Sequence, residues 1–132
     1  MHKFDVVIIG AGSAGLSALR EVKKHTDNFI LINEGPWGTT CARVGCMPSK
    51  LLIEAANAFY RRVSFNEFGI TGADQLGVDH KRVLQRVRRL RDDFVTSTLG
   101  ATRELGERAI SGRAHILSPH QVMVNGENFH TR

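Results

Sequence analysis

The stretch Phe4-Asp5-Val6-Val7-Ile8-Ile9-Gly10-Ala11-Gly12-Ser13-Ala14-Gly15 decides the fold of this 132-residue chain. Its first half is a near-continuous apolar run rich in β-branched residues, which is typical of a strand buried inside a parallel sheet. A Gly-x-Gly-x-x-Gly run follows at once, and apolar residues at helical spacing continue to about His25. Residues 29–32 form a second apolar run, so the sequence predicts a βαβ unit.

The glycines stand in the context that a dinucleotide-binding turn requires, with a strand before them and a helix after them. Gly10 allows the tight turn, Gly12 lets the backbone approach a pyrophosphate, and Gly15 permits close packing of helix against strand. The free N–H groups at the start of the helix stabilise phosphate charge. Glu34 ends the second strand, where it can accept both hydroxyls of an adenosine ribose. The alternative is a turn with nothing bound and a solvated Glu34, and the fingerprint alone does not choose FAD over NAD.

The rest of the chain completes an α/β pattern. A helix is predicted to open at Pro48, because apolar residues recur at helical spacing as far as Val63. A long amphipathic helix is predicted over 80–99, after an irregular glycine-containing segment. The segments 109–112, 114–117 and 121–124 are short and apolar, with turn signals at 118–120 and at Asn125-Gly126. They predict an antiparallel meander.

Composition limits the classes of protein that fit. Hydrophobic residues make up 42% of the chain and charged residues 23%, as in a soluble globular protein of one domain. Only four apolar residues follow the polar N-terminus, too few for a signal peptide or a membrane span. We therefore expect no membrane association and a cytoplasmic, reducing location.

Much of the net charge of +5 is concentrated in one stretch. A nucleic-acid-binding surface would be expected to carry aromatic residues among its cations. This stretch has none, so we expect no nucleic-acid partner. A solvated helix face or salt bridges to another domain explain the charge better. The cations are Lys81, Arg82, Arg86, Arg88, Arg89 and Arg91.

Cys41 and Cys46 are the only cysteines. An ideal helix would place residues five apart about 140° from each other around its axis, so the thiols meet only in a distorted turn. Gly38 and Gly45 would allow such a turn. The positive end of the helix that follows would stabilise a thiolate at Cys46, and Cys41 could exchange with an external disulfide.

Three other interpretations of the cysteines compete with a redox pair. A structural disulfide is disfavoured in a reducing compartment, and two inert buried thiols would need no partner. Zinc needs about four ligands, whereas the histidines show no paired spacing, so we predict no metal site. The histidines are at positions 2, 25, 80, 115, 120 and 130.

The run Gly38-Thr39-Thr40-Cys41-Ala42-Arg43-Val44-Gly45-Cys46-Met47-Pro48-Ser49-Lys50 resembles the cysteine motif of the pyridine nucleotide–disulfide oxidoreductases. This flavoprotein class includes dihydrolipoamide dehydrogenase, glutathione reductase and mercuric reductase, and Pro-Ser-Lys is more similar to the lipoamide and mercuric branches. The family motif reads Gly-Gly-x-Cys-x-x-x-x-Gly-Cys-x-Pro-Ser/Lys-Lys. The resemblance implies an incomplete Rossmann-like FAD-binding domain over residues 1–132.

The resemblance also implies roles for particular residues. Cys46 would be the flavin-facing thiol and Cys41 the interchange thiol, moving electrons between NAD(H) or NADP(H), FAD and a small-molecule or lipoyl-protein disulfide in a homodimer. FAD would be bound by Gly10, Gly12, Ser13, Ala14, Gly15, Glu34, Thr40, Cys41, Lys50 and the backbone of Ala114.

The chain departs from the family pattern in two places. Thr39 replaces the second glycine of the motif, so the backbone there is expected to stay out of glycine-only conformations. Ala42-Arg43 replaces the more usual apolar-Asn pair, which would bring a guanidinium near the substrate mouth. The nicotinamide-binding and dimerisation domains are not found, so we expect an N-terminal fragment that is inactive alone. The alternative function is a non-catalytic dinucleotide-binding or redox-sensing module.

Overall fold

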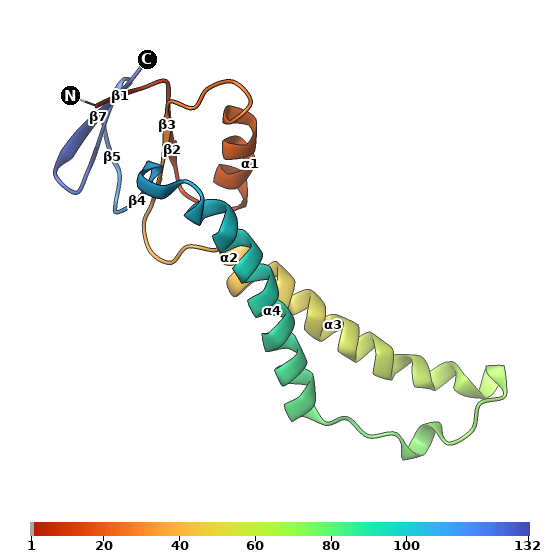
Figure 1. Ribbon diagram of the computed structural model, residues 1–132. Helices are drawn as coiled ribbons and strands as arrows, with labels where there is room; N and C mark the ends of the chain where they lie inside the picture. The colour runs from red at the N-terminus through yellow and green to blue at the C-terminus, as the bar shows by residue number, and fades with distance from the viewer. Residues whose placement is uncertain (1) are drawn as a thin grey trace.

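The computed structural model describes residues 2–132, in which a three-stranded parallel sheet carries the predicted βαβ unit (Figure 1). Strand β3 (Phe29–Asn33) lies between β2 (Val6–Ile9) and β4 (Ala109–Ser111). Helix α1 (Ser13–Val22) connects β2 to β3 and packs on one face of this sheet. The predicted α/β class, a parallel sheet combined with an antiparallel meander, is confirmed.

Strand β3 is buried on both faces, as its continuous apolar run predicts. Phe29 and Leu31 pack on one side, in a cluster that includes Leu19 of α1. Ile30 and Ile32 point to the other side, toward a second sheet. This alternation with period two places α1, the parallel sheet and the second sheet in three successive layers.

The second sheet has the strand order β1-β7-β6-β5. Its members are β1 (His2–Phe4), β5 (His115–Ser118), β6 (Gln121–Val124) and β7 (Glu127–Thr131). Asn125 and Gly126 join β6 to β7 with φ angles of 52° and 83°, as a two-residue hairpin turn of type I′ requires. The predicted turn is therefore present, although the sequence pattern did not identify β7.

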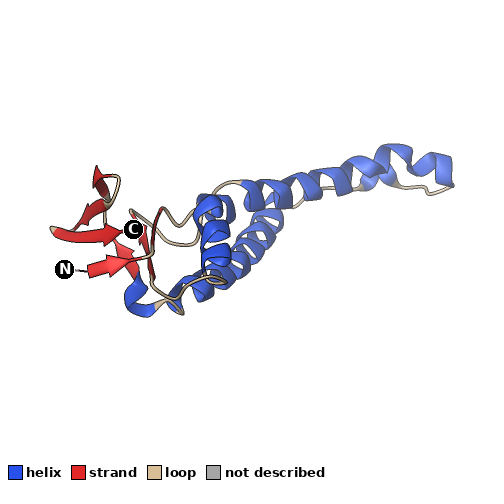
Figure 2. Ribbon diagram, turned by 90° about the horizontal axis from the view of Figure 1, so that it is seen from above, coloured by secondary structure: helices blue, strands red, loops and turns tan. Residues whose placement is uncertain are grey.

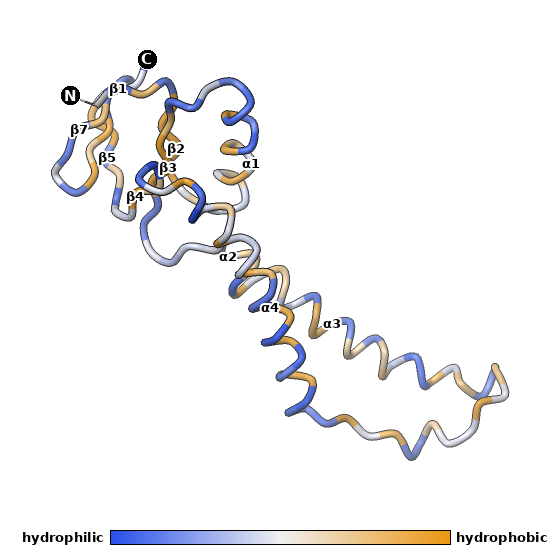
Figure 3. Tube along the Cα trace, viewed as in Figure 1, coloured by the Kyte–Doolittle hydropathy of each residue, from blue (hydrophilic) through white to orange (hydrophobic). Residues whose placement is uncertain are grey.

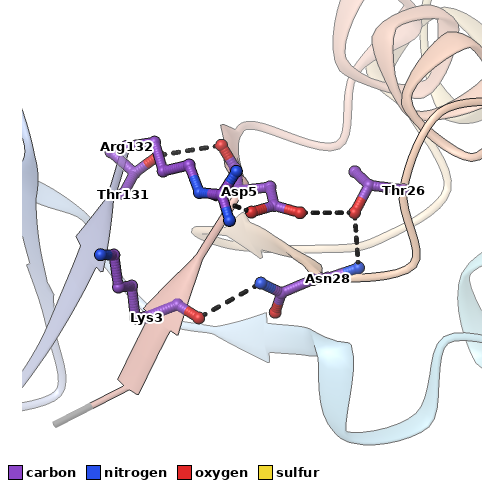
Figure 4. A network of polar contacts seen from close by, with 6 residues as sticks. All are labelled: Lys3, Asp5, Thr26, Asn28, Thr131 and Arg132. Carbon is purple, nitrogen blue, oxygen red and sulfur yellow. Dashed lines mark hydrogen bonds and ion pairs between the residues drawn. The ribbon is translucent and has the colours of Figure 1, made fainter.

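The first predicted strand is divided at Asp5, because Phe4 belongs to β1 and Val6 to β2. Asp5 Oδ2 accepts a hydrogen bond from Thr26 Oγ1 at 2.7 Å, and its Oδ1 lies 3.2 Å from Arg132 Nε (Figure 4). The Asp5 N–H donates to Asn28 O at 2.9 Å. These bonds hold the chain where it passes from one sheet to the other.

The prediction that 109–112 begins the meander is wrong. Residues of β4 pair in parallel with β3, with Ile110 opposite Ile32, and only β5, β6 and β7 form the antiparallel meander. A three-residue strand carries no pattern that distinguishes parallel from antiparallel pairing. The chain leaves the carboxyl end of β3 and comes back to the opposite end of the sheet before β4 begins. Strand β4 therefore runs in the same direction as β3.

That connection is a helical hairpin projecting away from the sheets (Figures 1 and 2). Helices α3 and α4 run side by side, and α4 continues beyond the predicted end at residue 99. Asp79 caps α4 by accepting a hydrogen bond from the Arg82 N–H at 3.0 Å. The helical segments are α2 (Thr40–Arg43), α3 (Cys46–Tyr60), α4 (His80–Arg103) and the 3₁₀ turns Arg61–Phe68, Ala73–Gln75 and Gly106–Arg108.

Apolar and polar residues alternate along both arms of the hairpin (Figure 3). Near its tip an apolar cavity of about 390 Å³ is lined by Leu52, Phe59, Val63 and Val83, among others. Within residues 2–132, none of the helices has the length and apolar character needed to cross a membrane.

Candidate functional site

The candidate site begins at the carboxyl ends of the three parallel strands. The Gly10 N–H donates to Ile32 O at 2.7 Å, and the Gly112 N–H donates to Asn33 O at 3.0 Å. The glycine turn after β2, the end of β3 and the segment after β4 therefore meet at one edge of the sheet. Ligands of open α/β sheets bind at this edge.

The three glycines of the turn serve different purposes. Gly10 has φ 97°, a value that favours glycine, and a Cβ on Gly15 would overlap the Gly10 carbonyl oxygen. A Cβ on Gly12 would meet no atom within 4 Å. Gly10 and Gly15 are therefore required by the turn itself, whereas Gly12 leaves open space through which a ligand can approach the backbone.

Helix α1 begins at Ser13 without a side-chain cap, since Gly12 is its N-cap residue. Ser13 and Ala14 are exposed in the first turn, and this turn contains no acidic residue. The backbone N–H groups at such a helix start attract an anion, and the helix dipole adds to this attraction. The open space at Gly12 and this uncapped helix start together fit the pyrophosphate of a dinucleotide.

Asn33, which the sequence analysis did not identify, holds the glycine turn in place. Its Oδ1 accepts a hydrogen bond from the Ala11 N–H at 2.9 Å, and its Nδ2 donates to Gly35 O at 3.3 Å. One side chain thus connects the turn to the loop after β3. The signal in the sequence was a single amide at the end of an otherwise apolar strand.

The structure brings Glu34 close to the segment that carries Ala114. Glu34 Oε2 lies 4.0 Å from Arg113 Nε, and both side chains are largely exposed. An ion pair this long and this exposed contributes little free energy, so the Glu34 carboxylate remains able to accept hydrogen bonds from a ligand. Ala114 is half-buried beside the core of the second sheet.

The loop between β3 and the cysteines is anchored to β4. Trp37 Nε1 donates a hydrogen bond to Ser111 Oγ at 2.9 Å, and Trp37 packs against the core cluster around α1. Asn125 Nδ2 donates to Ser111 O at 2.9 Å, which connects this strand to the meander as well. These contacts fix the place from which the cysteine loop starts.

The two cysteines lie together as free thiols, with Cys41 half-buried and Cys46 exposed. Helix α2 ends at Arg43, and Gly45 (φ −120°, ψ −110°) turns the chain before α3 begins at Cys46. This is the distorted turn that the spacing of five requires. A hydrogen bond with the Cys46 thiol, followed by desolvation, raises the pKa of Cys41, while the positive charge of Lys50 acts in the opposite direction.

Thr39 contradicts the expectation for its backbone. Its φ of 57° and ψ of 143° lie close to a region that essentially only glycine populates. The Thr39 side chain is buried, and its Oγ1 accepts a hydrogen bond from the Ala42 N–H at 2.9 Å. The surrounding structure therefore holds a β-branched residue in a conformation that its own sterics disfavour.

A cavity of about 370 Å³ connects the two parts of the site. Its lining includes Ser13 at the start of α1, Cys41 of α2 and Met47 of α3. Thr40 is exposed on the same helical turn as Cys41, and the side chain of Arg43 is half-buried beside Gly38. The start of α1, directly after the glycine turn, and Cys41 of the thiol pair thus border a common space, and the residues present fit an extended dinucleotide such as FAD.

Comparison with known proteins gives the family. The family model described as pyridine nucleotide-disulphide oxidoreductase matches residues 4–128. The chain belongs to this family. The predicted resemblance is confirmed, and the family consists of flavoprotein disulfide oxidoreductases that depend on FAD and NAD(P).

Pyridine nucleotide-disulphide oxidoreductases from bacteria and yeast align with almost the whole chain. Dihydrolipoyl dehydrogenase of Bacillus subtilis is 30% identical over 124 residues, which is 93% of this chain and 27% of the relative. The Mycoplasma genitalium enzyme of the same name is 29% identical over 128 residues, 97% of this chain and 28% of the relative. Glutathione reductase of Schizosaccharomyces pombe is 31% identical, over 92% of this chain and 26% of the relative.

A solved flavoprotein disulfide reductase has the same fold. The Cu(II) complex of the HOCl-induced flavoprotein disulfide reductase RclA from Escherichia coli superposes with a TM-score of 0.71 at 23% identity. The match covers 99% of this chain and 27% of that protein, which confirms the Rossmann-like fold class. The chain spans about a quarter of the length of the curated relatives it matches.

Proposed function

We propose that this chain carries the FAD-binding turn and the redox-active cysteine pair of a flavoprotein disulfide oxidoreductase similar to dihydrolipoamide dehydrogenase. One observation carries the proposal: Ser13, at the uncapped start of α1, and Cys41 line the same cavity. A dinucleotide bound at the glycine turn can extend through this space toward the thiols. FAD, when bound, supplies a two-electron acceptor that connects the thiol pair to a nicotinamide co-substrate.

The chain's own residues would hold the cofactor. Gly12, Ser13 and Ala14 offer backbone N–H groups and close approach to its pyrophosphate, with Gly10 and Gly15 forming the turn. The binding of the adenosine half is assigned to Glu34 and to the backbone of Ala114. Thr40, Cys41 and Lys50 are assigned to the flavin half.

Thiol–disulfide exchange follows from the pairing of Cys41 and Cys46. With the pair oxidised, a substrate thiolate attacks the Cys41 sulfur, the Cys41–Cys46 bond breaks, and Cys46 leaves as a thiolate. The second substrate thiolate then attacks the substrate sulfur of this mixed disulfide and releases Cys41. The substrate dithiol has lost two electrons and two protons and has become a disulfide, and the protein pair has gained the two electrons. A disulfide substrate is reduced by the same steps in reverse.

The wider assignments are part of the same proposal. The substrate is a small-molecule or lipoyl-protein dithiol, the co-substrate is NAD(H) or NADP(H), and the location is cytoplasmic. A homodimer is supported by the large apolar side chains exposed on the helical hairpin, among them Tyr60 and Phe68. On this proposal residues 1–132 are the N-terminal part of the FAD-binding domain, and the nicotinamide and dimerisation domains lie elsewhere in the enzyme.

The absorption spectrum of the purified full-length enzyme that contains this chain tests the proposal. We expect flavin bands, with a long-wavelength charge-transfer shoulder on mild reduction that Cys46→Ser abolishes and Cys41→Ser retains. A colourless protein whose thiols still oxidise reversibly would contradict the proposal and favour a redox-sensing module. We also expect the 132-residue chain alone to lack NADH-dependent disulfide reductase activity.

A further inference from the structure

We propose that Thr39 is a positioning residue for the Cys41 thiol. Its buried hydroxyl holds the one-turn helix α2 in the place where Cys41 meets Cys46. The inference rests on the proposed function, because it takes the two cysteines as the exchanging pair. Three observations carry it: the backbone conformation of Thr39, the bond made by its hydroxyl, and the shortness of α2.

The backbone of Thr39 does not favour the observed loop. A positive φ brings the side chain of a β-branched residue against its own backbone, and such residues occur there only when surrounding contacts impose the conformation. Gly38, the preceding residue, also has a positive φ of 101°. The loop therefore needs contacts that compensate for the cost at Thr39.

The hydroxyl of Thr39 supplies one such contact. Thr39 is only 9% exposed, and its Oγ1 accepts from the Ala42 N–H at 2.9 Å. Its carbonyl oxygen accepts from the Arg43 N–H at 3.1 Å. Two of the backbone N–H groups at the start of α2 thus bond to this single residue, as at an N-cap.

The position of Cys41 depends on this cap because α2 has only four residues. A helix of one turn has almost no internal hydrogen bonds of its own, so its end contacts decide whether it forms. The returning chain is close, since a Cβ on Gly45 would lie 3.5 Å from Cys41 Cα. A small displacement of α2 therefore changes the fraction of time in which the Cys41 sulfur is close enough to bond to the Cys46 sulfur.

Four variants separate the hydroxyl from the backbone strain. Thr39→Ser keeps the hydroxyl, Thr39→Ala removes it and keeps a Cβ at positive φ, and Thr39→Gly removes both. Thr96→Ala is the control, because it removes a threonine hydroxyl from the exposed surface of α4, where that hydroxyl donates to Asp92 O rather than accepting from a backbone N–H as the Thr39 hydroxyl does.

The readout is the equilibrium between the Cys41–Cys46 disulfide and the dithiol in glutathione buffers, measured by alkylation and mass. Two glutathione thiols reduce the protein disulfide to two thiols and become one glutathione disulfide. Loss of a threonine N-cap predicts an equilibrium constant for disulfide formation about tenfold lower in Thr39→Ala. Thr39→Gly is expected to stay within about twofold, because glycine is itself accepted at an N-cap and tolerates the positive φ. Thr39→Ser and Thr96→Ala are expected to stay within about twofold of the unchanged protein.

A purely structural role would change the stability of these variants but not this equilibrium. Equal constants in all folded variants would overturn the inference about Thr39 alone. If Thr39→Ala does not fold, Thr39→Val takes its place, because it keeps the β-branched shape and lacks the hydroxyl. A constant for Thr39→Val equal to that of Thr39→Ser would overturn the inference. Failure of the unchanged protein to form a Cys41–Cys46 disulfide at any glutathione ratio would overturn the proposed function together with this inference.

Discussion

Gly15 packs so closely on Gly10 that a Cβ at position 15 would overlap the carbonyl oxygen of Gly10. At Gly12, three residues earlier, the same Cβ would meet no atom within 4 Å. Two glycines of one motif are thus required for different reasons. The Gly15–Gly10 contact belongs to the packing of α1 on β2, whereas the space at Gly12 is available to a ligand.

Alanine at these two positions should separate folding from cofactor binding. We expect Gly15→Ala to lower the free energy of unfolding by about 1–3 kcal/mol or more, because a backbone atom must move. Gly12→Ala should leave stability nearly unchanged and reduce the flavin bound per protein. Urea denaturation and the ratio of flavin to protein absorbance measure the two effects. Undiminished flavin binding by Gly12→Ala would contradict the assigned position of the pyrophosphate.

Asn33 offers a test of the contact that holds the glycine turn. Asn33→Ala leaves the Ala11 N–H without its acceptor and is expected to cost about 1–3 kcal/mol. Asn33→Asp keeps that acceptor but places a negative charge beside the pyrophosphate position, so it should retain more stability and still bind flavin weakly. Equal stability of the Ala and Asp variants would show that the bond to Ala11 contributes nothing.

Asp5 joins three segments that are far apart in the sequence, as Figure 4 shows. Asp5→Ala removes the acceptor of the Thr26 hydroxyl and is expected to destabilise the fold by about 1.5–3 kcal/mol. Asp5→Asn keeps an acceptor and loses only the attraction to the exposed Arg132, so its cost should be below about 1 kcal/mol. Thermal and urea unfolding measure the destabilisation in both variants. A larger loss of stability in Asp5→Asn than in Asp5→Ala would contradict the role assigned to the bond with Thr26.

The pKa of Cys41 should respond in opposite directions to its two neighbours. Cys46→Ala removes the hydrogen bond that raises the pKa of Cys41, so more thiolate forms at pH 8 and iodoacetamide alkylates Cys41 faster. Lys50→Ala removes a charge that lowers this pKa, so alkylation of Cys41 should slow. Rate profiles from pH 6 to 10 with peptide mass mapping measure both shifts, and shifts of the same sign would refute the assigned causes.

The same pKa shift predicts a pH dependence of stability. Because the pKa of folded Cys41 lies above that of the unfolded chain, the protonated thiol favours the folded state. This contribution is complete below the unfolded pKa and is lost as pH rises through the folded pKa. The loss should therefore occur on the alkaline side, and Cys41→Ser should remove it from the pH profile of unfolding.

Much of the site could be predicted because its signals are local. The glycine turn, the βαβ unit and the spacing of the cysteines need only neighbouring residues to be recognised. Asn33 and Ser111 could not be found in this way. Each is an ordinary polar residue whose role comes from partners brought near it by the fold, Ala11 in one case and Trp37 in the other.

The sequence by itself determined the α/β class and the glycine turn at Gly10–Gly15, because periodicity and glycine spacing are properties of the local chain. Only the tertiary structure decided that β4 joins the parallel sheet and that Thr39 adopts a positive φ. A three-residue strand takes its direction from the connection that delivers it. Thr39 takes its conformation from a buried hydrogen bond and the surrounding packing, which outweigh its local preference.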